Sequence, residues 1–332
     1  MSKIYQPKNM LVTGGAGFIG ANFIRHILST YDDIHVVNYD KLSYAGNLDN
    51  LKNLSNEKHY HFVQGDICDT KLVAKTLRDF SIDTIIHFAA ESHVDRSISG
   101  PADFIQTNIV GTFTLLEAAR HYWLEEKHWN KMQCRFHHIS TDEVFGTLGK
   151  EDPAFTETTP YAPNSPYSAS KASSDHLVRA YHHTYKLPTT ITNCSNNYGP
   201  YQHPEKFIPT VIRSCKEWKS IPVYGDGSNI RDWLHVQDHC EAIDLVIREG
   251  KLGESYNVGG NNEKTNLEVV NTICELMDEQ FPREKSYKTL ISFVEDRKGH
   301  DWRYAIDDHK IATELKWKAK LPFLKGLKNL IF

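Results

Sequence analysis

Near its N-terminus the chain reads Met10-Leu11-Val12-Thr13-Gly14-Gly15-Ala16-Gly17-Phe18-Ile19-Gly20. A short apolar run, typical of a buried strand, leads directly into glycines that recur every third residue. Apolar residues then continue at helical spacing over residues 18–28. Glycines permit a tight turn and close approach of the backbone, and a helix N-terminus offers free N–H groups. The stretch therefore predicts a strand, a turn and a helix that bind the pyrophosphate of a dinucleotide.

The spacing Gly-x-x-Gly-x-x-Gly indicates the Rossmann domain of the short-chain dehydrogenase type. Asp40 ends the next predicted strand, residues 35–39, about twenty positions after Gly20. A carboxylate there accepts from the ribose hydroxyls and repels a 2′-phosphate, so NAD is favoured over NADP. Further strands are predicted at residues 59–64, 84–88, 135–140 and 188–193.

Helical patterns at residues 70–80, 103–122 and 167–185 alternate with these strands. Strands that alternate with helices predict an α/β fold with a parallel, doubly wound Rossmann sheet. We expect an NAD-binding domain in residues 1–193, with returning elements near 230–250, and a smaller interleaved C-terminal lobe for the substrate in residues 194–332. Helices are predicted there at 207–218, 238–249 and 267–281.

The composition is that of an ordinary globular protein of 332 residues, with 40% hydrophobic and 24% charged residues. A net charge of −4 gives no general attraction to nucleic acid or to an anionic membrane. The six cysteines form no Cys-x-x-Cys pair, and no signal peptide or transmembrane run is found. We therefore expect reduced thiols, a cytoplasmic location, and neither nucleic acid nor membrane as a partner.

Tyr167 and Lys171 are four residues apart, so they share one face of a predicted helix. A Lys ammonium beside the phenol, together with a positively charged nicotinamide, would favour the phenolate. The phenolate can then take a hydroxyl proton while hydride leaves the same carbon. Thr141, at the end of the strand predicted at 135–140, can hydrogen-bond that hydroxyl.

Asp142 and Glu143 follow Thr141 directly. Ligands of open parallel sheets bind outside the carboxyl ends of the strands, where this pair is expected. An alcohol dehydrogenase needs no such pair. Elimination of water next to a ketone does, because one group must remove the alpha proton and another must protonate the departing hydroxyl. The alternative is a pair that caps a turn and faces solvent.

Other polar residues leave two interpretations open. Asp66 could reach the adenine edge or cap the helix at 70–80. Thr107 and Asn108, inside the long helix, could face a ligand or bond across to a loop. Paired histidines lie in strand and helix patterns without a convergent carboxylate or cysteine, so no metal site is predicted. They are His59 and His61, His137 and His138, and His182 and His183.

At this density of motifs the chain resembles the dTDP-glucose 4,6-dehydratases of the extended short-chain dehydrogenase/reductase superfamily. The resemblance rests on the sequences TGGAGFIG (13–20), YDKLSYAGN (39–47), GDI (65–67), FAAESHVDRSI (88–98), STDEVFG (140–146), SPYSASKA (165–172), NNYGPYQHPEKFIP (196–209), YGDGSNIRDW (224–233) and DRKGHD (296–301). It implies oxidation at C4, elimination of water across C5 and C6, and return of hydride to C6. The product would be a 4-keto-6-deoxy sugar nucleotide, with NAD regenerated in each turnover.

The resemblance also implies roles for individual residues. Tyr167 would be the base for C4 oxidation, assisted by Lys171 and Thr141. Glu143 would take the C5 proton, and Asp142 would protonate the C6 hydroxyl as it leaves. A homodimer would form through the two long helices near residues 107–122 and 167–185.

Expected cofactor contacts are Gly14, Gly17, Phe18, Ile19, Gly20, Asp40, Leu42, Ser43, Asp66, Ile67, Ala89, Ala90, Ser92, Thr107, Tyr167, Lys171 and Asn197. Expected substrate contacts are Ser92, Thr141, Asn196, Glu205, Lys206, Pro222, Tyr224, Arg231, Asn266, Arg297 and His300. The cations Lys206, Arg231 and Arg297 and the side chain of His300 suit a diphosphate.

The chain departs from the family pattern at Lys298, where proline is usual, and at Phe145, which replaces a common tyrosine. Neither position is catalytic, so these departures bear on substrate affinity. A nucleotide-sugar 4-epimerase would share the fold, NAD and the Tyr/Lys pair, but would not need Asp142 and Glu143. A decarboxylase of the superfamily would need one acid there, and a non-catalytic NAD-binding scaffold would need none. UDP-glucose in place of dTDP-glucose stays an open alternative.

Overall fold

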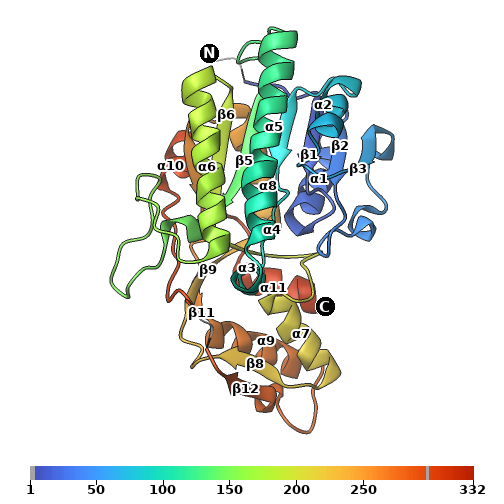
Figure 1. Cartoon of the computed structure of the whole chain (residues 1–332). Helices are drawn as coiled ribbons and strands as arrows, with labels where there is room; N and C mark the ends of the chain where they lie inside the picture. The colour runs from blue at the N-terminus through green and yellow to red at the C-terminus, as the bar shows by residue number, and fades with distance from the viewer. Residues whose placement is uncertain (1–3, 297–298) are drawn as a thin grey trace.

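The centre of the molecule is a parallel sheet of seven strands in the order β10-β6-β5-β4-β1-β2-β3 (Figure 1). The computed structural model describes residues 4–296 and 299–332. The strands of this sheet are β1 (Asn9–Thr13), β2 (His35–Asp40), β3 (Tyr60–Gln64), β4 (Thr84–His87), β5 (Arg135–Thr141), β6 (Thr189–Cys194) and β10 (Ser255–Val258). The predicted fold class, a doubly wound α/β sheet, is confirmed.

Helices cover both faces of this sheet, which is why its strands are apolar on both sides. One face packs against α1 (Phe18–Thr30) and α8 (Val236–Glu249). The other face packs against α2 (Thr70–Asp79), α5 (Thr112–Ala119) and α6 (Pro166–Tyr185), as Figure 1 shows. The strand order reverses between β1 and β4, so a crevice opens at the carboxyl ends of the strands there.

The helix predicted at 103–122 is longer than expected. It runs without a break through α4 (Ala102–Phe104), the wider-wound turns η3 (Ile105–Gly111), α5 and a second wide segment, η4 (Arg120–Glu126). The helix therefore continues four residues beyond the predicted end at 122. Trp123 explains the extension, because its buried ring lies in the sheet-facing core and its indole N–H donates to the carbonyl of Ile82 at 2.7 Å.

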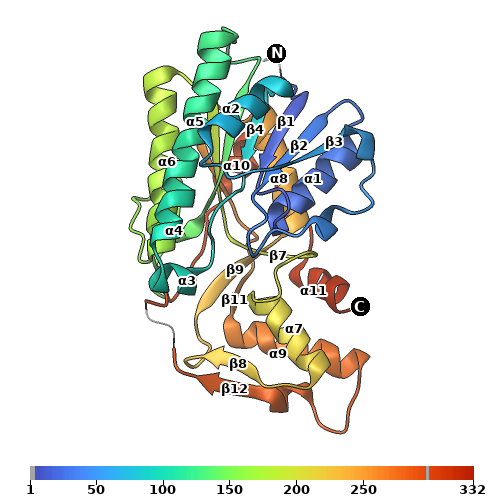
Figure 2. The same cartoon turned by 45° about the vertical axis from the view of Figure 1, so that its right-hand side comes forward.

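The second lobe lies below the carboxyl ends of the strands and contains two small sheets (Figure 2). One sheet joins β7 (Asn196–Tyr198), β9 (Ile230–His235) and β11 (Glu263–Thr265), and the other joins β8 (Ile221–Tyr224) and β12 (Ile291–Val294). The hydrophobic core of this lobe is formed by side chains of α7 (Phe207–Glu217), α9 (Asn266–Gln280) and α11 (Phe323–Ile331). Short helices are α3 (Val94–Ser99), α10 (His309–Glu314), η1 (Leu48–Leu51), η2 (Glu57–His59), η5 (Asp142–Phe145) and η6 (Tyr287–Leu290).

The chain crosses between the two parts more than once. After β9 it returns to the large sheet as α8 and β10, and β10 pairs with β6 at the sheet edge. Strand β10 was not predicted, because its four residues lie close behind Gly253 and are too short to show a period. The division of the chain at residue 193 stays a prediction.

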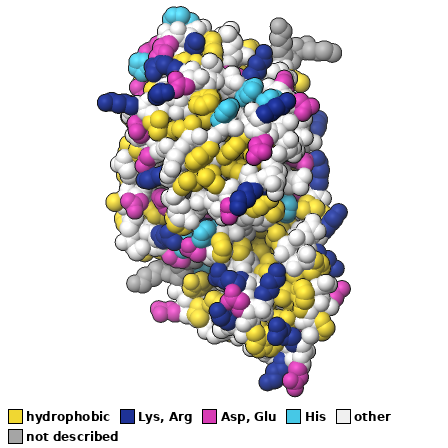
Figure 3. Space-filling model, turned by 90° about the vertical axis from the view of Figure 1, so that its right-hand side faces the viewer, with side chains coloured by type: hydrophobic (Ala, Val, Ile, Leu, Met, Phe, Trp, Pro, Cys, Tyr) yellow, Lys and Arg dark blue, Asp and Glu magenta, His cyan; other side chains and the backbone are white. Residues whose placement is uncertain are grey.

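Charged side chains of both signs are interspersed on the face shown in Figure 3. Within residues 4–296 and 299–332, no helix combines the length and the apolar character needed to cross a membrane.

Candidate active site

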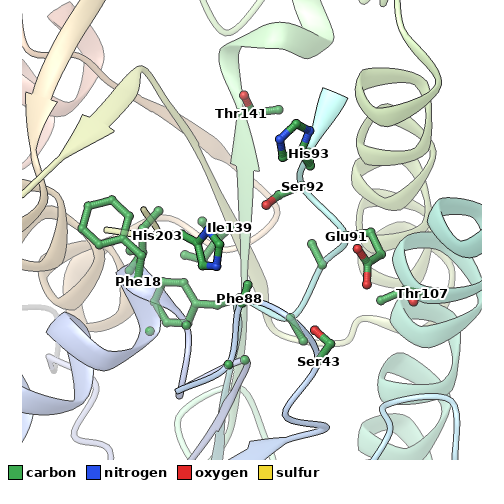
Figure 4. A pocket seen from close by; sticks show the side chains of 18 of the residues that line it. Phe18, Ser43, Phe88, Glu91, Ser92, His93, Thr107, Ile139, Thr141 and His203 are labelled. Carbon is green, nitrogen blue, oxygen red and sulfur yellow. The ribbon is translucent and has the colours of Figure 1, made fainter. Parts of the chain in front are cut away.

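A cavity of about 330 Å³ lies at the carboxyl ends of β1, β2, β4 and β5. Figure 4 shows its side chains: Phe18 and His203 lie on one side, and Glu91 and Thr107 on the other, with Thr141 at the end of β5. The cavity continues to the start of α6 and to residues 194–206, which lead into the second lobe. It therefore brings the predicted dinucleotide loop and the predicted catalytic residues to one place.

The glycine loop forms one wall, and its glycines are sterically required. Gly14 has φ +69°, and a Cβ there would lie 2.7 Å from the backbone of Ala89. A Cβ at Gly20 would lie 2.4 Å from the carbonyl oxygen of Gly14. The N-terminus of α1 has no side-chain cap and no acidic residue in its first turn. Its N–H groups are thus available to an anion, so the loop fits a pyrophosphate.

Asp40 ties this loop to the end of β2. Its buried carboxylate accepts hydrogen bonds from the backbone N–H groups of Ala16 at 2.9 Å and Leu42 at 2.8 Å. Burial raises the pKa of this carboxyl, and the two backbone bonds oppose that effect. Ser43 lines the cavity, whereas Leu42 does not and instead forms the turn with φ +57°.

The open interpretations for Asp66 and the long helix are resolved by hydrogen bonds. Asp66 lines the cavity and pairs with Lys41 at 2.7 Å, whereas α2 is capped by Asp69. The capping role of Asp66 is therefore wrong. Asn108 bonds across to a loop, since it exchanges hydrogen bonds of 2.8 and 3.0 Å with the backbone of Glu91, and Thr107 lines the cavity.

The remaining expected cofactor residues also lie at this wall. Among them, the cavity lining includes Gly17, Phe18, Ile19, Ile67, Ala89, Ala90 and Ser92. The small alanines follow β4, so backbone atoms form the surface there.

Asp142 is the most deeply buried acid of the cavity, with 2% of its surface exposed. Thr141 ends β5 and caps η5: its hydroxyl accepts from the N–H of Glu143 at 3.3 Å and donates to Asp142 Oδ1 at 3.2 Å. Oδ2 of Asp142 is buried and has no hydrogen-bond partner among the described residues. Burial first, and then the charge of Glu143, raise the pKa of Asp142 well above its ordinary value. Burial therefore favours the protonated form of Asp142, whereas Glu143 is only half-buried.

Tyr167 lies in the first turn of α6, which begins with a capping box between Ser165 and Ser168. Lys171 lies one turn later, buried, and its ammonium donates to the carbonyl of Ile139 at 2.7 Å. Both side chains line the cavity beside Thr141. The Tyr-x-x-x-Lys pair is thus placed at the end of β5, beside Asp142 and Glu143.

The electrostatics of this pair differ from the expectation. Burial, followed by the charge of Glu143, raises the pKa of Tyr167 well above its ordinary value. Burial lowers the pKa of Lys171 to about 8, and the carboxylate of Asp175 acts against that fall. Ionisation of Tyr167 therefore depends on further positive charge brought into the cavity.

Three predicted residues reach the cavity from the segment that leads into the second lobe. Lys206 lines it and donates to the carbonyl of Ser92 at 3.2 Å. Asn196 lines it with a buried Oδ1 that has no hydrogen-bond partner among the described residues. Asn197 lines it and contacts His239 Nδ1 at 2.9 Å.

Six other predicted substrate residues do not line this cavity. They are Glu205, Pro222, Tyr224, Arg231, Asn266 and His300. Arg231 is buried, donates to the carbonyl of Asp301 at 2.9 Å and lies over the ring of Tyr304. Glu205 pairs with Arg96 at 3.0 Å. Arg297, like Lys298, lies outside the described residues.

Sequence reasoning missed several lining residues, including Tyr44, Glu91, His93, Cys194 and His203. Tyr44 lies within a motif that carried the resemblance, and the guanidinium of Arg96 lies 3.7 Å from its ring centroid. His203 lies within another such motif, at 196–209, but no role was assigned to it. The described residues contain no group of three metal-ligating side chains placed to hold an ion.

Comparisons with known proteins place this geometry in a family. A sequence model of the family described as GDP-mannose 4,6 dehydratase matches residues 11–330. The chain is 57% identical to a dTDP-glucose 4,6-dehydratase from Shigella flexneri, over 97% of this chain and 91% of that protein. It is 56% identical, with the same coverage, to dTDP-glucose 4,6-dehydratase 1 from Escherichia coli K12.

Solved structures with the same fold support this family assignment. A dTDP-glucose 4,6-dehydratase from Streptomyces venezuelae with NAD bound superposes with a TM-score of 0.89 at 44% identity, over 97% of this chain and 95% of that one. The enzyme of that name from Bacillus anthracis, in complex with NAD, gives 0.86 at 46% identity with the same coverage. A UDP-glucose 4-epimerase from Thermotoga maritima shares the fold, with a TM-score of 0.84 at 27% identity over 97% of each chain. The chain belongs to the dTDP-glucose 4,6-dehydratase family of the extended short-chain dehydrogenase/reductase superfamily.

Proposed function

We propose that this protein converts dTDP-glucose to dTDP-4-keto-6-deoxyglucose and water, with NAD as its resident cofactor. The observation that carries the proposal is a buried Asp142, whose pKa burial raises, next to a half-buried Glu143, both beside Tyr167 and Lys171 in one cavity. The names of the relatives, at 56–57% identity over 97% of this chain, support the same reaction.

The residues for the cofactor are those of the glycine wall. The α1 N-terminus would receive the pyrophosphate, Asp40 and Ser43 the adenosine ribose, and Asp66 and Ile67 the adenine side. Bound there, NAD would take up the hydride released from C4 of the sugar and supply the hydride returned to C6. The N–H groups left without a cap and the small Ala89 and Ala90 fit that group.

Tyr167, Lys171 and Thr141 would carry the first step. Tyr167 takes the proton of the C4 hydroxyl, and Thr141 hydrogen-bonds the same oxygen. Because burial raises the pKa of Tyr167, the Lys171 ammonium and the positive charge of the oxidised cofactor are needed to favour the phenolate.

Glu143 and Asp142 would carry the elimination. The ketone at C4 acidifies the proton on C5, which the carboxylate of Glu143 removes. Burial favours the protonated form of Asp142, and its buried Oδ2 has no hydrogen-bond partner among the described residues, so Asp142 can protonate the C6 hydroxyl as that group leaves. Different burial divides the acid and base tasks between adjacent carboxylates.

Residues of the second lobe would hold the nucleotide. Lys206 and Asn196 already line the cavity, and Arg231 lies close enough to Asp142 to affect its pKa. Cations in this lobe suit a diphosphate. Glu205, Pro222, Tyr224, Asn266 and His300 complete the proposed set, together with Arg297.

The protein would act as a homodimer in the cytoplasm. The helix of residues 102–126 and α6 lie side by side on one face of the molecule (Figure 1). Ile105, Val110 and Phe113 project from the first of these, exposed by 48%, 37% and 46%. Large apolar side chains on one face favour a partner helix pair. The six free cysteines support a reducing compartment.

The test is mass spectrometry of dTDP-glucose and of UDP-glucose after incubation with the purified protein, with no NAD added. Loss of one water from the dTDP sugar alone would support the reaction, the base preference and a retained cofactor. Equal loss from both sugars would support a dehydratase without base selection. Conversion to a galactose isomer without a mass change would instead mean an epimerase and would refute the roles of Asp142 and Glu143.

A further inference from the structure

Asp175 is a buried carboxylate of α6, one turn after Lys171, with no exposed surface. Its Oδ2 accepts from the hydroxyls of Ser140 at 2.7 Å and Tyr161 at 2.8 Å. Ser140 immediately precedes the catalytic residues of β5, and Tyr161 belongs to the loop that leads into α6. A buried ionised carboxylate is costly unless hydrogen bonds and an opposite charge compensate it.

The opposite charge is supplied by Lys171 and not by the histidine between them. His138 Nε2 lies 3.2 Å from Asp175 Oδ1 and 3.4 Å from Lys171 Nζ. Burial lowers the pKa of His138 to about 4, so the imidazole is neutral at neutral pH. Against burial, the pKa of Asp175 is lowered first by its hydrogen bond and electrostatic interaction with His138, then by the charge of Lys171 and the hydrogen bond from Ser140.

The neutral imidazole can serve only one of these neighbours through Nε2. A single ring nitrogen either donates or accepts, and a carboxylate can only accept. An ionised Asp175 therefore fixes the tautomer with the proton on Nε2. In that tautomer His138 cannot accept a hydrogen bond from Lys171. The ammonium therefore donates one hydrogen bond to the carbonyl of Ile139, and its other N–H groups can donate to a molecule in the cavity that Lys171 lines.

We propose that Asp175 is a positioning residue for Lys171: through its charge and through the tautomer of His138, it keeps the ammonium protonated and directed to the cavity. The inference rests on the proposed function, because it deepens the role of Lys171 in C4 oxidation. Asp175 touches no reacting atom and acts through Lys171.

The groups around Lys171 leave Asp175 as its source of full negative charge. From β4, His87 is neutral, because burial lowers its pKa well below its ordinary value. From β6, Cys194 is a thiol, because burial raises its pKa. His138 faces Lys171 from β5 and is neutral, and Tyr167 on the same helix is also neutral in the protein alone.

Tyr161 couples this charge to the loop before α6. Its hydroxyl accepts from Arg179 at 3.3 Å while it donates to Asp175, and its ring packs edge-on against Phe145 with centroids 5.2 Å apart. Arg179 is thus the further cation near Asp175, separated from it by the phenol. Two residues before Phe145 lies Glu143, so the ring that packs against Tyr161 belongs to the short helix η5 that carries the base.

The test is the pH dependence of C4 oxidation of dTDP-glucose in Asp175→Asn, followed by the transient NADH absorbance of a single turnover in stopped flow. An ammonium without its anion loses its proton at lower pH, so the alkaline limb of the rate profile should fall by about one pH unit or more. A role in folding alone would lower the rate at every pH and leave the limb where it is. An alkaline limb at the wild-type pH would overturn the proposal.

Two further variants make the result specific. Asp244→Asn is the matched control, since Asp244 is a buried carboxylate of α8 that pairs with Arg248 at 2.8 Å. It should lose stability without moving the limb. If Asp175→Asn does not fold, Ser140→Ala combined with Tyr161→Phe removes two donors that hold Asp175 ionised. This double variant should move the limb in the same direction, and an unmoved limb there would equally overturn the proposal.

A second readout does not depend on turnover. In histidine-labelled protein, the ¹⁵N shifts of His138, assigned with a His138→Asn variant, should show a proton on Nε2. They should lose that signature in Asp175→Asn, because an amide can donate to Nε2. If the wild type does not act on dTDP-glucose, the proposed function fails, and these shifts still decide whether Asp175 sets the tautomer. A proton on Nδ1 in the wild type would refute it.

Discussion

Asp142→Asn should remove activity and at the same time stabilise the protein. Asn fills the same space and its carbonyl can still accept from Thr141, but it cannot donate a proton to a leaving hydroxyl. General acid catalysis contributes about 10²- to 10⁴-fold, so the dehydration rate should fall by that factor, or about 3–5 kcal/mol in the barrier.

The gain in stability follows from the raised pKa of Asp142. Its pKa is well above 3.8 in the folded protein, because of burial and of Glu143, and returns to that value on unfolding. Between these two values the unfolded chain binds fewer protons, so the wild type loses stability as the pH rises. Asn does not titrate. The stability of the variant relative to the wild type should therefore grow by up to about 1.4 kcal/mol per pH unit above about pH 4.

The assay is urea unfolding of both proteins at several values between about pH 4 and pH 7. Asp244→Asn serves as the control without a slope in this range. Burial alone would raise the pKa of Asp244, but hydrogen bonds from His26 and Tyr31 and its pair with Arg248 lower it. The stability that this carboxylate contributes is lost only below about pH 4, so between about pH 4 and pH 7 the variant should be less stable than the wild type by a nearly constant amount. A difference between Asp142→Asn and the wild type that stays constant with pH would refute the buried neutral acid.

Other variants test the remaining roles. Glu143→Gln should still oxidise C4 but not eliminate water, so NADH absorbance should build up; turnover at the wild-type rate would remove Glu143 from the mechanism. Tyr167→Phe should lower even that oxidation by about 10²- to 10⁴-fold while NAD content stays near that of the wild type. Gly20→Ala places a Cβ 2.4 Å from the Gly14 carbonyl oxygen, so the purified protein should carry little NAD by absorbance. Phe113→Glu should shift the mass in light scattering to that of one chain, and an unchanged mass would place the dimer contact elsewhere.

The parts of the fold that sequence predicted are those with strong local signals. The glycine loop could be predicted, because a turn residue with φ +69°, such as Gly14, is rarely any residue other than glycine. Helix α9 was predicted within one residue at each end, and a capping box between Thr265 and Glu268 accounts for its start. Strand β10 was missed because four residues that gain their order from pairing with β6 carry no period of their own.

The pKa shifts of the site could not be predicted from the sequence either. The adjacency of Asp142 and Glu143 predicted two carboxylates with divided tasks, but burial is what makes one of them neutral. The pKa of Tyr167 is raised in the protein alone by burial and then by the charge of Glu143, and sequence spacing shows neither. The sequence did not indicate a role for Asp175, because the residues that hydrogen-bond it, Ser140 and Tyr161, lie in other elements of the fold.

The late return of the chain to the large sheet has a consequence during synthesis. The apolar side of α1, with Phe23 and Ile27, packs against Val236, Ile243 and other residues of α8. A ribosome that has made only the first 193 residues has produced the whole dinucleotide loop but nothing to cover that side. Such an intermediate exposes apolar surface and an open strand edge at β6, the features that recruit chaperones or lead to aggregation. Helix α8 must therefore be made before that side of α1 can be covered.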